Sequence, residues 1–172
     1  MHSVIPDQLS THSLEVGFLA HSLAIIGNKI YGKNYNLERI AVKAMYHDVP
    51  EIFTGDIPTP VKYYSDETKQ AYDAVEVASL NKLTEMLPEE LRQEYSELFS
   101  YTEEEKMLIK AADRISAYIK CLEEKNYGNR EFELAGERLL FALREMKCEE
   151  AEYFLQAFLE SFGLPIDSIL EK

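Results

Sequence analysis

The sequence has no tryptophan, only four histidines and only two cysteines in its 172 residues. The two cysteines, Cys121 and Cys148, are far apart in the chain. This spacing predicts neither a disulfide framework nor a Cys-x-x-Cys metal or redox motif. We expect both thiols to be small buried side chains in a reducing, cytoplasmic environment.

Positive charge is scarce as well, with 18 basic against 31 acidic residues and a net charge of −13. A protein that binds nucleic-acid polymers needs a basic face to neutralise phosphates, so we expect no such partner. The acidic balance also disfavours an anionic membrane surface. No apolar run reaches the roughly 18 residues that span a bilayer. The longest, Val16 to Ile26, contains His21 and has no basic residue before it, unlike a signal peptide.

Apolar residues are abundant, at 46% of the chain, and they recur with helical rather than alternating period. The pattern predicts one all-α domain over residues 1–172, a compact bundle of six to seven helices. The helices are expected near residues 10–29, 36–54, 66–86, from Pro88, 102–125, 131–146 and 151–162, with a loop at 55–60. A hydroxyl at Ser10 or Thr11 should cap the first, and Thr102 with Glu105 forms a capping box. The apolar stripe of the last helix indicates core or a dimer interface.

Several titratable residues that could form a functional site lie in the second predicted helix. The pair His47 and Asp48 lies within an apolar stretch, where a buried imidazole and carboxylate are costly unless they have partners. Pro50 should kink the helix, and Glu51 follows His47 by four residues, which places both on one side. Taken alone, the dipeptide is more typical of a merely hydrogen-bonded histidine than of a metal ligand.

Two further residues strengthen a metal hypothesis. His12 lies in the first turn of the first helix, and Asp113 lies on a row of small and apolar residues in the helix from 102. Asp113 could instead pair with Lys110 or Arg114. Together with His47 and Asp48, they offer two imidazoles and two carboxylates, a set that suits a first-row divalent ion with open positions for water and substrate. Magnesium would prefer more oxygen ligands.

These residues resemble those of the HD-domain metal-dependent phosphohydrolases, and more closely the 5′-deoxynucleotidase branch of that superfamily. The similar segments are spread over most of the chain: residues 11–14, 20–23, 44–48, 51–63, 112–113 and 117–124. The most specific is the run Thr-Gly-Asp-Ile-Pro-Thr-Pro-Val-Lys-Tyr at 54–63.

The resemblance implies an enzyme that releases deoxynucleoside and phosphate from deoxyribonucleoside 5′-monophosphates. It implies one divalent transition metal, Co or Mn with Fe, Ni, Cu and Zn as further candidates, and a homodimer. The implied metal ligands are His12, His47, Asp48 and Asp113. The implied substrate contacts are Asp56 near the sugar 3′ side, Ile57, Pro58, Thr59, Lys62, Asp48 and Asp113. Glu51 and Asp48 would be catalytic, although Glu51 could instead orient a histidine and Lys62 could simply be solvated.

Members of this family carry an Arg-Trp pair upstream of the first metal-binding histidine. Here only eleven residues precede His12 and no tryptophan is present. We therefore expect the upstream segment to be missing, through a late or misassigned start, or phosphate binding to differ. Two alternatives stay open: an HD phosphohydrolase with another nucleotide substrate, or a metal-binding dimeric domain with impaired catalysis.

Overall fold

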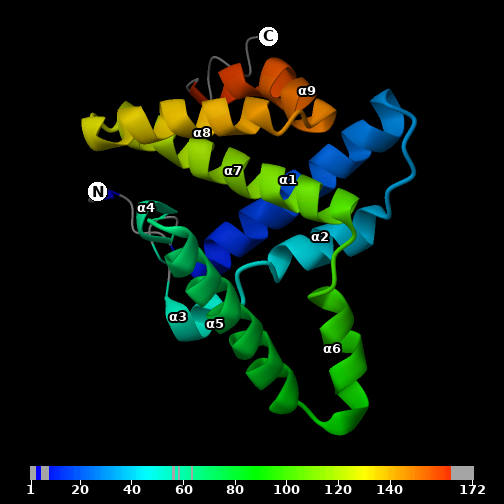
Figure 1. Cartoon of the computed structure of the whole chain (residues 1–172). Coiled ribbons are helices and arrows are strands. Elements are labelled where there is room, and N and C mark those ends of the chain that lie inside the picture. The colour runs from blue at the N-terminus through cyan, green and yellow to red at the C-terminus, as the bar shows by residue number, and fades with distance from the viewer. Residues whose placement is uncertain (1–2, 5–7, 56, 58, 63, 164–172) are drawn as a thin grey trace. The chain divides into compact units, whose positions relative to one another are not determined.

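The computed structural model describes residues 3–4, 8–55, 57, 59–62 and 64–163, with only the backbone of 59, 60 and 163. They group into two compact units (Figure 1). Unit 1 comprises Met1–Met45 and Thr102–Lys172, and unit 2 comprises Tyr46–Tyr101. The described part of unit 1 contains α1 (Leu9–Ile30), α2 (Leu37–Met45), α7 (Glu103–Asn126), α8 (Glu133–Glu145) and α9 (Glu149–Phe158), with short 3-10 helices at Arg130–Phe132 and Leu159–Gly163.

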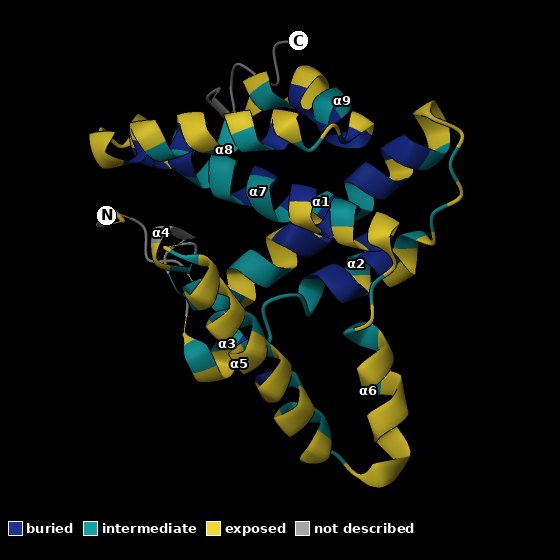
Figure 2. Ribbon diagram, viewed as in Figure 1, coloured by how far each residue is buried: buried dark blue, intermediate teal, exposed yellow. Residues whose placement is uncertain are grey.

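Unit 1 is built around α1 and α7, which pack on each other. The helix α2 packs on both, α8 on α7, and α9 on α1. Their fully buried side chains include Leu23 of α1, Ile40 of α2 and Leu108 and Ile115 of α7. Figure 2 shows that the buried residues lie along α1 and α7. The two long helices thus form a hydrophobic core that fixes the residues they carry.

A buried ionic cluster joins α2 to the start of α7. Lys43, only 1% exposed, lies with its Nζ 2.7 Å from Oε2 of Glu105, and Arg39 donates from Nε to Oε1 at 2.8 Å. Glu105 also accepts the backbone N–H of Thr102, and Thr102 accepts that of Glu105, which completes the predicted capping box. Burial raises the pKa of Glu105, but these hydrogen bonds outweigh it and hold the pKa below 4.5.

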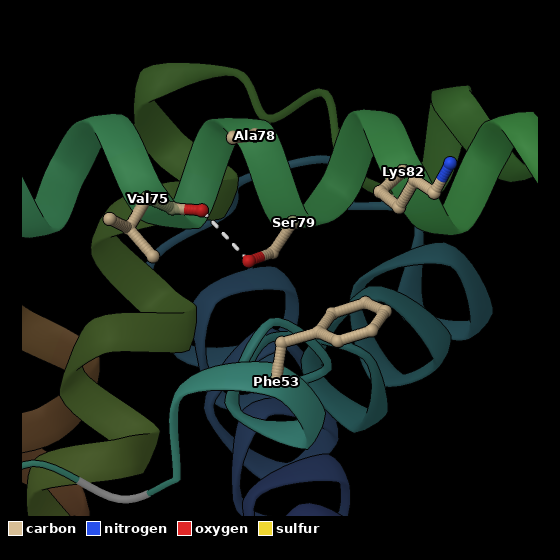
Figure 3. Close-up of a pocket in the computed structure, with 5 residues that line it drawn as sticks. All are labelled: Phe53, Val75, Ala78, Ser79 and Lys82. Carbon is tan, nitrogen blue, oxygen red and sulfur yellow. Dashed lines mark hydrogen bonds between the residues drawn. The ribbon is translucent and has the colours of Figure 1, made fainter.

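Unit 2 contains the four-residue helices α3 (Glu51–Thr54) and α4 (Thr59–Lys62), then α5 (Asp66–Glu85), a 3-10 turn at Glu89–Leu91 and α6 (Arg92–Leu98). Ser65 caps α5 by accepting the N–H of Thr68 at 3.2 Å. A shallow, mostly apolar hollow of about 260 Å³ lies between α3 and α5 (Figure 3). It is lined by Phe53, Val75, Ala78, Ser79 and Lys82.

The all-α prediction is confirmed, since the described residues form helices and no strand. The described residues hold nine α-helices, against six to seven predicted, because the α3 and α4 turns form where one long helix and a loop were expected. The predicted hydroxyl cap of α1 is wrong: the cap position is Gln8, whose side chain makes no capping bond, and Ser10 and Thr11 already lie inside the helix. Asn36 does cap α2, accepting the N–H of Arg39 at 2.9 Å.

The predicted single helix over 36–54 is also wrong in its second half. The helix α2 ends at Met45, and the next five residues form tight turns in which Val49 N donates to Tyr46 O and Glu51 N to Asp48 O. Pro50 has no N–H and cannot make the α-helical bond to Tyr46 O, so the chain adopts the tighter i to i−3 pattern. The turn breaks the regular period that placed Glu51 on the same side as His47.

Both cysteines are buried free thiols, as predicted. In the C-terminal stripe, Ala151, Phe154 and Leu155 are buried in unit 1, whereas Phe158 and Phe162 are 45% and 40% exposed. Among the described helices, none combines the length and the apolar character needed to cross a membrane.

Candidate metal centre

Unit 1 supplies one histidine and one carboxylate from its two central helices. His12 is in the first turn of α1, and Asp113 lies in the middle of α7, which packs on α1. Nε2 of His12 is 3.3 Å from Oδ1 of Asp113, and the side chains are 21% and 41% exposed. His12 is thus a partner of Asp113, while Arg114 donates from Nη1 to the carbonyl of Ala142. The pair is accessible to a small solute.

The turn after α2 carries a second histidine and carboxylate. His47 and Asp48 lie in the turn that follows α2, and Nε2 of His47 is 3.0 Å from Oδ2 of Asp48. Their side chains are 11% and 24% exposed. Short-range backbone hydrogen bonds close the turn and hold the backbone of these two residues.

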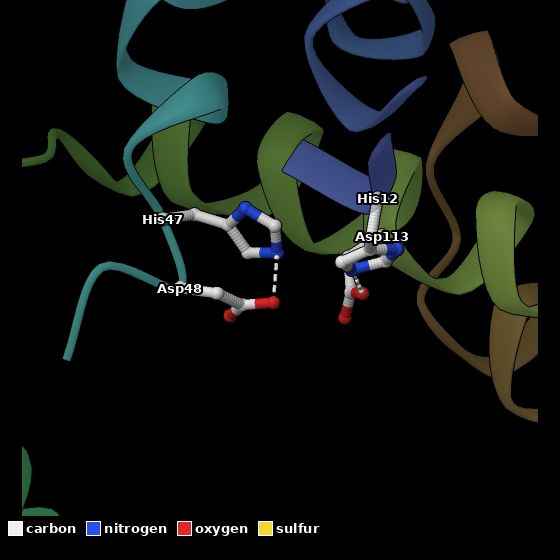
Figure 4. A group of neighbouring side chains, drawn as sticks. All are labelled: His12, His47, Asp48 and Asp113. Carbon is white, nitrogen blue, oxygen red and sulfur yellow. Dashed lines mark ion pairs between the residues drawn. The ribbon is translucent and has the colours of Figure 1, made fainter. Parts of the chain in front are cut away.

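The four side chains predicted as ligands form one group: a ligand atom of each lies within 4.8 Å of the others (Figure 4). Figure 4 shows each imidazole facing one carboxylate. Ligands held about 2.0–2.2 Å from one ion lie up to about 4 Å apart, which is the scale of this group. Two neighbouring carboxylates repel each other unless a cation compensates them. Donor types and spacing therefore fit a single divalent metal.

The other predicted residues are placed less fully. Glu51 begins α3 and is half-buried, and Ile57 is half-buried. Lys62 ends α4, and its ammonium forms an ion pair with Glu76 of α5. Asp56 and Pro58 lie outside the described residues, as does the side chain of Thr59. The roles of this set in substrate binding and catalysis stay predictions.

Two residues beside His12, Ser116 and Glu15, were not singled out by the sequence pattern. Ser116 of α7 has its Oγ 3.3 Å from Nδ1 of His12, and it also donates to Oε2 of Glu15 at 3.3 Å. A signal for them exists in the spacing, since Glu15 follows His12 and Ser116 follows Asp113 by three residues, one helical turn in each case. Only the packing of α1 on α7 brings the two turns together.

Comparison with known proteins finds relatives that match nearly the whole chain. A 5′-deoxynucleotidase of Vibrio parahaemolyticus is 51% identical over 172 residues, covering 98% of this chain and 89% of the relative. The 5′-deoxynucleotidase YfbR of Shigella boydii is 47% identical and covers 98% and 86%.

Among solved structures, an HD-domain phosphohydrolase of Listeria innocua matches with a TM-score of 0.78 at 25% identity, over 94% of this chain and 79% of that one. A protein of Pyrococcus horikoshii, 24% identical, shares the fold with a TM-score of 0.66 over 92% and 84%. The family model described as 5′-deoxynucleotidase YfbR-like matches residues 1–162. With its four ligand-type side chains grouped on an HD-domain fold, the chain belongs to the YfbR-like 5′-deoxynucleotidase family.

Proposed function

We propose that this protein hydrolyses deoxyribonucleoside 5′-monophosphates to a deoxynucleoside and inorganic phosphate in a metal-dependent reaction. The observation that carries the proposal is the group of His12, His47, Asp48 and Asp113, all within 4.8 Å by one ligand atom each. The relatives named 5′-deoxynucleotidase support the substrate class. A mononucleotide needs only a local positive centre, so the acidic surface of the chain is compatible with this substrate.

The donor set favours a transition metal. Imidazole nitrogens suit Zn, Cu, Fe and Ni, whereas carboxylates suit Mn and Mg, and a set of two each lies between these preferences. We propose Co²⁺ or Mn²⁺ as the metal that supports turnover. A bound divalent ion supplies positive charge for phosphoryl oxygens and lowers the pKa of a water at the site.

The side chains of the protein have distinct parts in the reaction. Asp48 and Asp113 hold the metal and border the phosphate, and the two histidines complete the ligand set. Glu51, at the start of α3, orients the attacking water and accepts its proton, or alternatively orients a histidine. Water adds its oxygen to phosphorus, the bond from phosphorus to the 5′ oxygen breaks, and a proton passes to that leaving oxygen.

The residues that follow α3 recognise the sugar. We propose that Asp56, Ile57, Pro58 and Thr59 meet the nucleoside, with Asp56 near the 3′ side. A carboxylate packed there would leave no room for a 2′-hydroxyl, which would favour deoxyribonucleotides. Lys62 is a weaker candidate for a phosphate contact because its charge is already compensated by Glu76.

The direct test offers dAMP, dCMP, dGMP, dTMP and dUMP, with their ribonucleotide counterparts, to purified protein loaded with Co²⁺ or Mn²⁺. Phosphate release from the deoxynucleotides, and little from the ribonucleotides, is the expected result. Folded, metal-loaded protein that releases phosphate from none of them would overturn the enzymatic proposal. Binding that raises the melting temperature without turnover would instead indicate a catalytically impaired domain.

The largest expected loss of activity is from Asp48→Ala. It removes one of the two carboxylates in the group, so we expect metal stoichiometry to fall and phosphate release to drop at least about a hundredfold, as for loss of a residue that acts in the site. Asp73→Ala is the matched control, because Asp73 is an exposed carboxylate of α5 that pairs with Lys69 on the same helix. Retained activity in Asp48→Ala would remove Asp48 from the ligand set.

We further propose a homodimer in the cytoplasm. The partly exposed rings of Phe158, at the end of α9, and Phe162, in the 3-10 helix that follows, lie beside buried Phe154 and form an apolar edge suited to a second copy. The two free buried thiols are consistent with a reducing compartment. Light scattering coupled to gel filtration measures the oligomeric state directly, and a monomer at micromolar concentration would contradict the dimer.

A further inference from the structure

Ser116 is a buried residue whose hydroxyl makes one hydrogen bond with a proposed metal ligand and one with a neighbour of that ligand. It lies on α7 one turn after Asp113 and is 5% exposed. Its Oγ is 3.3 Å from Nδ1 of His12 and 3.3 Å from Oε2 of Glu15, which lies one turn after His12 on α1. Each of the two packed helices thus contributes a proposed ligand and, one turn further on, a residue beside it.

The hydrogens in this arrangement can be assigned by counting. A serine hydroxyl has a single hydrogen, and Ser116 donates it to Oε2 of Glu15. The oxygen of Ser116 can therefore only accept from His12. A neutral imidazole that donates from Nδ1 has its lone pair on Nε2, where a metal can bind.

The atom left with the lone pair is the one that faces the other proposed ligand. Nε2 of His12 is 3.3 Å from Oδ1 of Asp113. A lone pair and a carboxylate oxygen at this distance repel each other, and a cation shared by both removes the repulsion. Metal-binding histidines commonly donate their other ring N–H to a neighbouring acceptor, which fixes the tautomer and the ring orientation.

We propose that Glu15 and Ser116 are positioning residues that hold His12 as the Nδ1–H tautomer with Nε2 directed at the metal. This inference rests on the proposed metal-dependent function and extends it to residues that touch no substrate. Glu15 orients the hydroxyl of Ser116, and Ser116 orients the ring of His12.

The first test measures Co²⁺ affinity by competition with a chelator. Ser116→Ala removes the acceptor, and we expect affinity to fall about 10- to 100-fold, the usual cost of losing such a partner. Ser116→Thr keeps the hydroxyl and should rescue most of the affinity. Glu15→Leu should weaken binding and Glu15→Gln, which keeps an acceptor oxygen, should not. Because Glu15 is exposed, its variants test the relay even where Ser116→Ala lowers stability.

Ser79→Ala is the matched control. Ser79 is also a buried helical serine, 7% exposed, but its hydroxyl donates to the carbonyl of Val75 on its own helix. We expect its Co²⁺ affinity to equal that of the unaltered protein. Equal affinity in Ser116→Ala, Glu15→Leu and the unaltered protein would overturn the proposal.

A second readout follows the tautomer itself. The protein is labelled with ¹⁵N-histidine, loaded with diamagnetic Zn²⁺ and studied by NMR. The ring N–H signal that is lost in His12→Gln belongs to His12. We expect this proton to reside on Nδ1 and to exchange slowly with water. Ser116→Ala should speed this exchange. A proton on Nε2 of His12 would contradict the proposal.

The two proposals fail in different ways. Unaltered protein that binds Co²⁺ through His12 but releases no phosphate defeats the enzymatic function and leaves the positioning role intact. Active protein whose metal affinity and N–H exchange are insensitive to Ser116 and Glu15 defeats only the positioning role. Protein that binds no metal defeats both.

Discussion

Unit 1 and unit 2 differ in how their helices are stabilised. In unit 1, the helices α1, α2 and α7 bury large apolar side chains completely, among them Leu23, Ile40 and Leu108. In the described part of unit 2, only Pro50 and Ser79 are buried, and α5 and α6 are largely exposed (Figure 2). Apolar packing therefore contributes most of the stability of the helices in unit 1. In unit 2, helix caps, tight turns and surface ion pairs contribute a larger share.

The difference matters for the proposed metal ligands because their backbone positions are fixed in different ways. His12 and Asp113 belong to helices with fully buried neighbours such as Val16 and Ala112, so their backbone positions are fixed by close packing. His47 and Asp48 depend on backbone hydrogen bonds around Pro50. The comparison predicts that equivalent substitutions will cost far more stability in unit 1 than in unit 2.

The strongest test replaces a buried lysine. Lys43→Met leaves the carboxylate of Glu105 in a protein interior without its closest cation, and we expect it to lower the free energy of unfolding by about 3–5 kcal/mol. The matched change in unit 2 is Lys69→Met, which breaks the exposed pair with Asp73 and should cost about 0.5 kcal/mol or less.

Urea denaturation followed by circular dichroism measures both changes. Equal losses from Lys43→Met and Lys69→Met would show that the ionic cluster of unit 1 is not more strongly coupled to folding than a surface pair, and the contrast between the units would fail.

A second test compares two leucines. Leu108→Ala removes a side chain that is 0% exposed in the middle of the unit 1 core, and we expect a loss of about 2–5 kcal/mol from lost burial and an unfilled cavity. Leu91→Ala, at a position 43% exposed in unit 2, should cost about 1 kcal/mol or less. The same urea titration measures both.

If Leu91→Ala is as damaging as Leu108→Ala, the exposed side chains of unit 2 are covered in solution by something the chain alone does not show, such as a second copy. Gel filtration of the two variants at several concentrations distinguishes that outcome from a simple error in the comparison.

How far the sequence predicts this structure also differs between regions. The helix α7 was predicted within a residue or two because its start depends on a local signal, the capping box of Thr102 and Glu105. The break after Met45 was not predicted. The effect of Pro50 extends over the whole preceding turn, and which tighter hydrogen bonds replace the helix depends on its surroundings.

The candidate site shows the same division. His12, His47, Asp48 and Asp113 could be predicted because charged or titratable groups on apolar helical rows are costly without a ligand. Ser116 and Glu15 could not, because serine in a helix and glutamate on its surface are ordinary. Ser116 contacts His12 and Glu15 only through the packing of α1 on α7, which the helical period does not specify.

The smallest expected effect is a loss of stability in acid that originates in unit 1. Burial raises the pKa of Glu150, but hydrogen bonds from Lys33, its own backbone N–H and Cys148 outweigh it, so the pKa is lowered, as for Glu105. A carboxylate with a lowered pKa in the folded state stabilises the protein above its unfolded pKa of about 4.5, and this contribution disappears as the pH falls through the folded value.

We therefore expect the free energy of unfolding to be insensitive to these two groups above about pH 5 and to fall as the pH drops below about 4.5. Glu150→Gln should be less stable at pH 7 and lose less on acidification, because it cannot take up the proton. Glu104→Gln, an exposed position in the first turn of α7, is the control and should keep the acid transition of the unaltered protein. An acid transition that is unchanged in Glu150→Gln would contradict this assignment of the acid sensitivity. Hydrogen exchange at pH 4 would then test the exposed helices of unit 2, because such helices open at lower cost than a packed core.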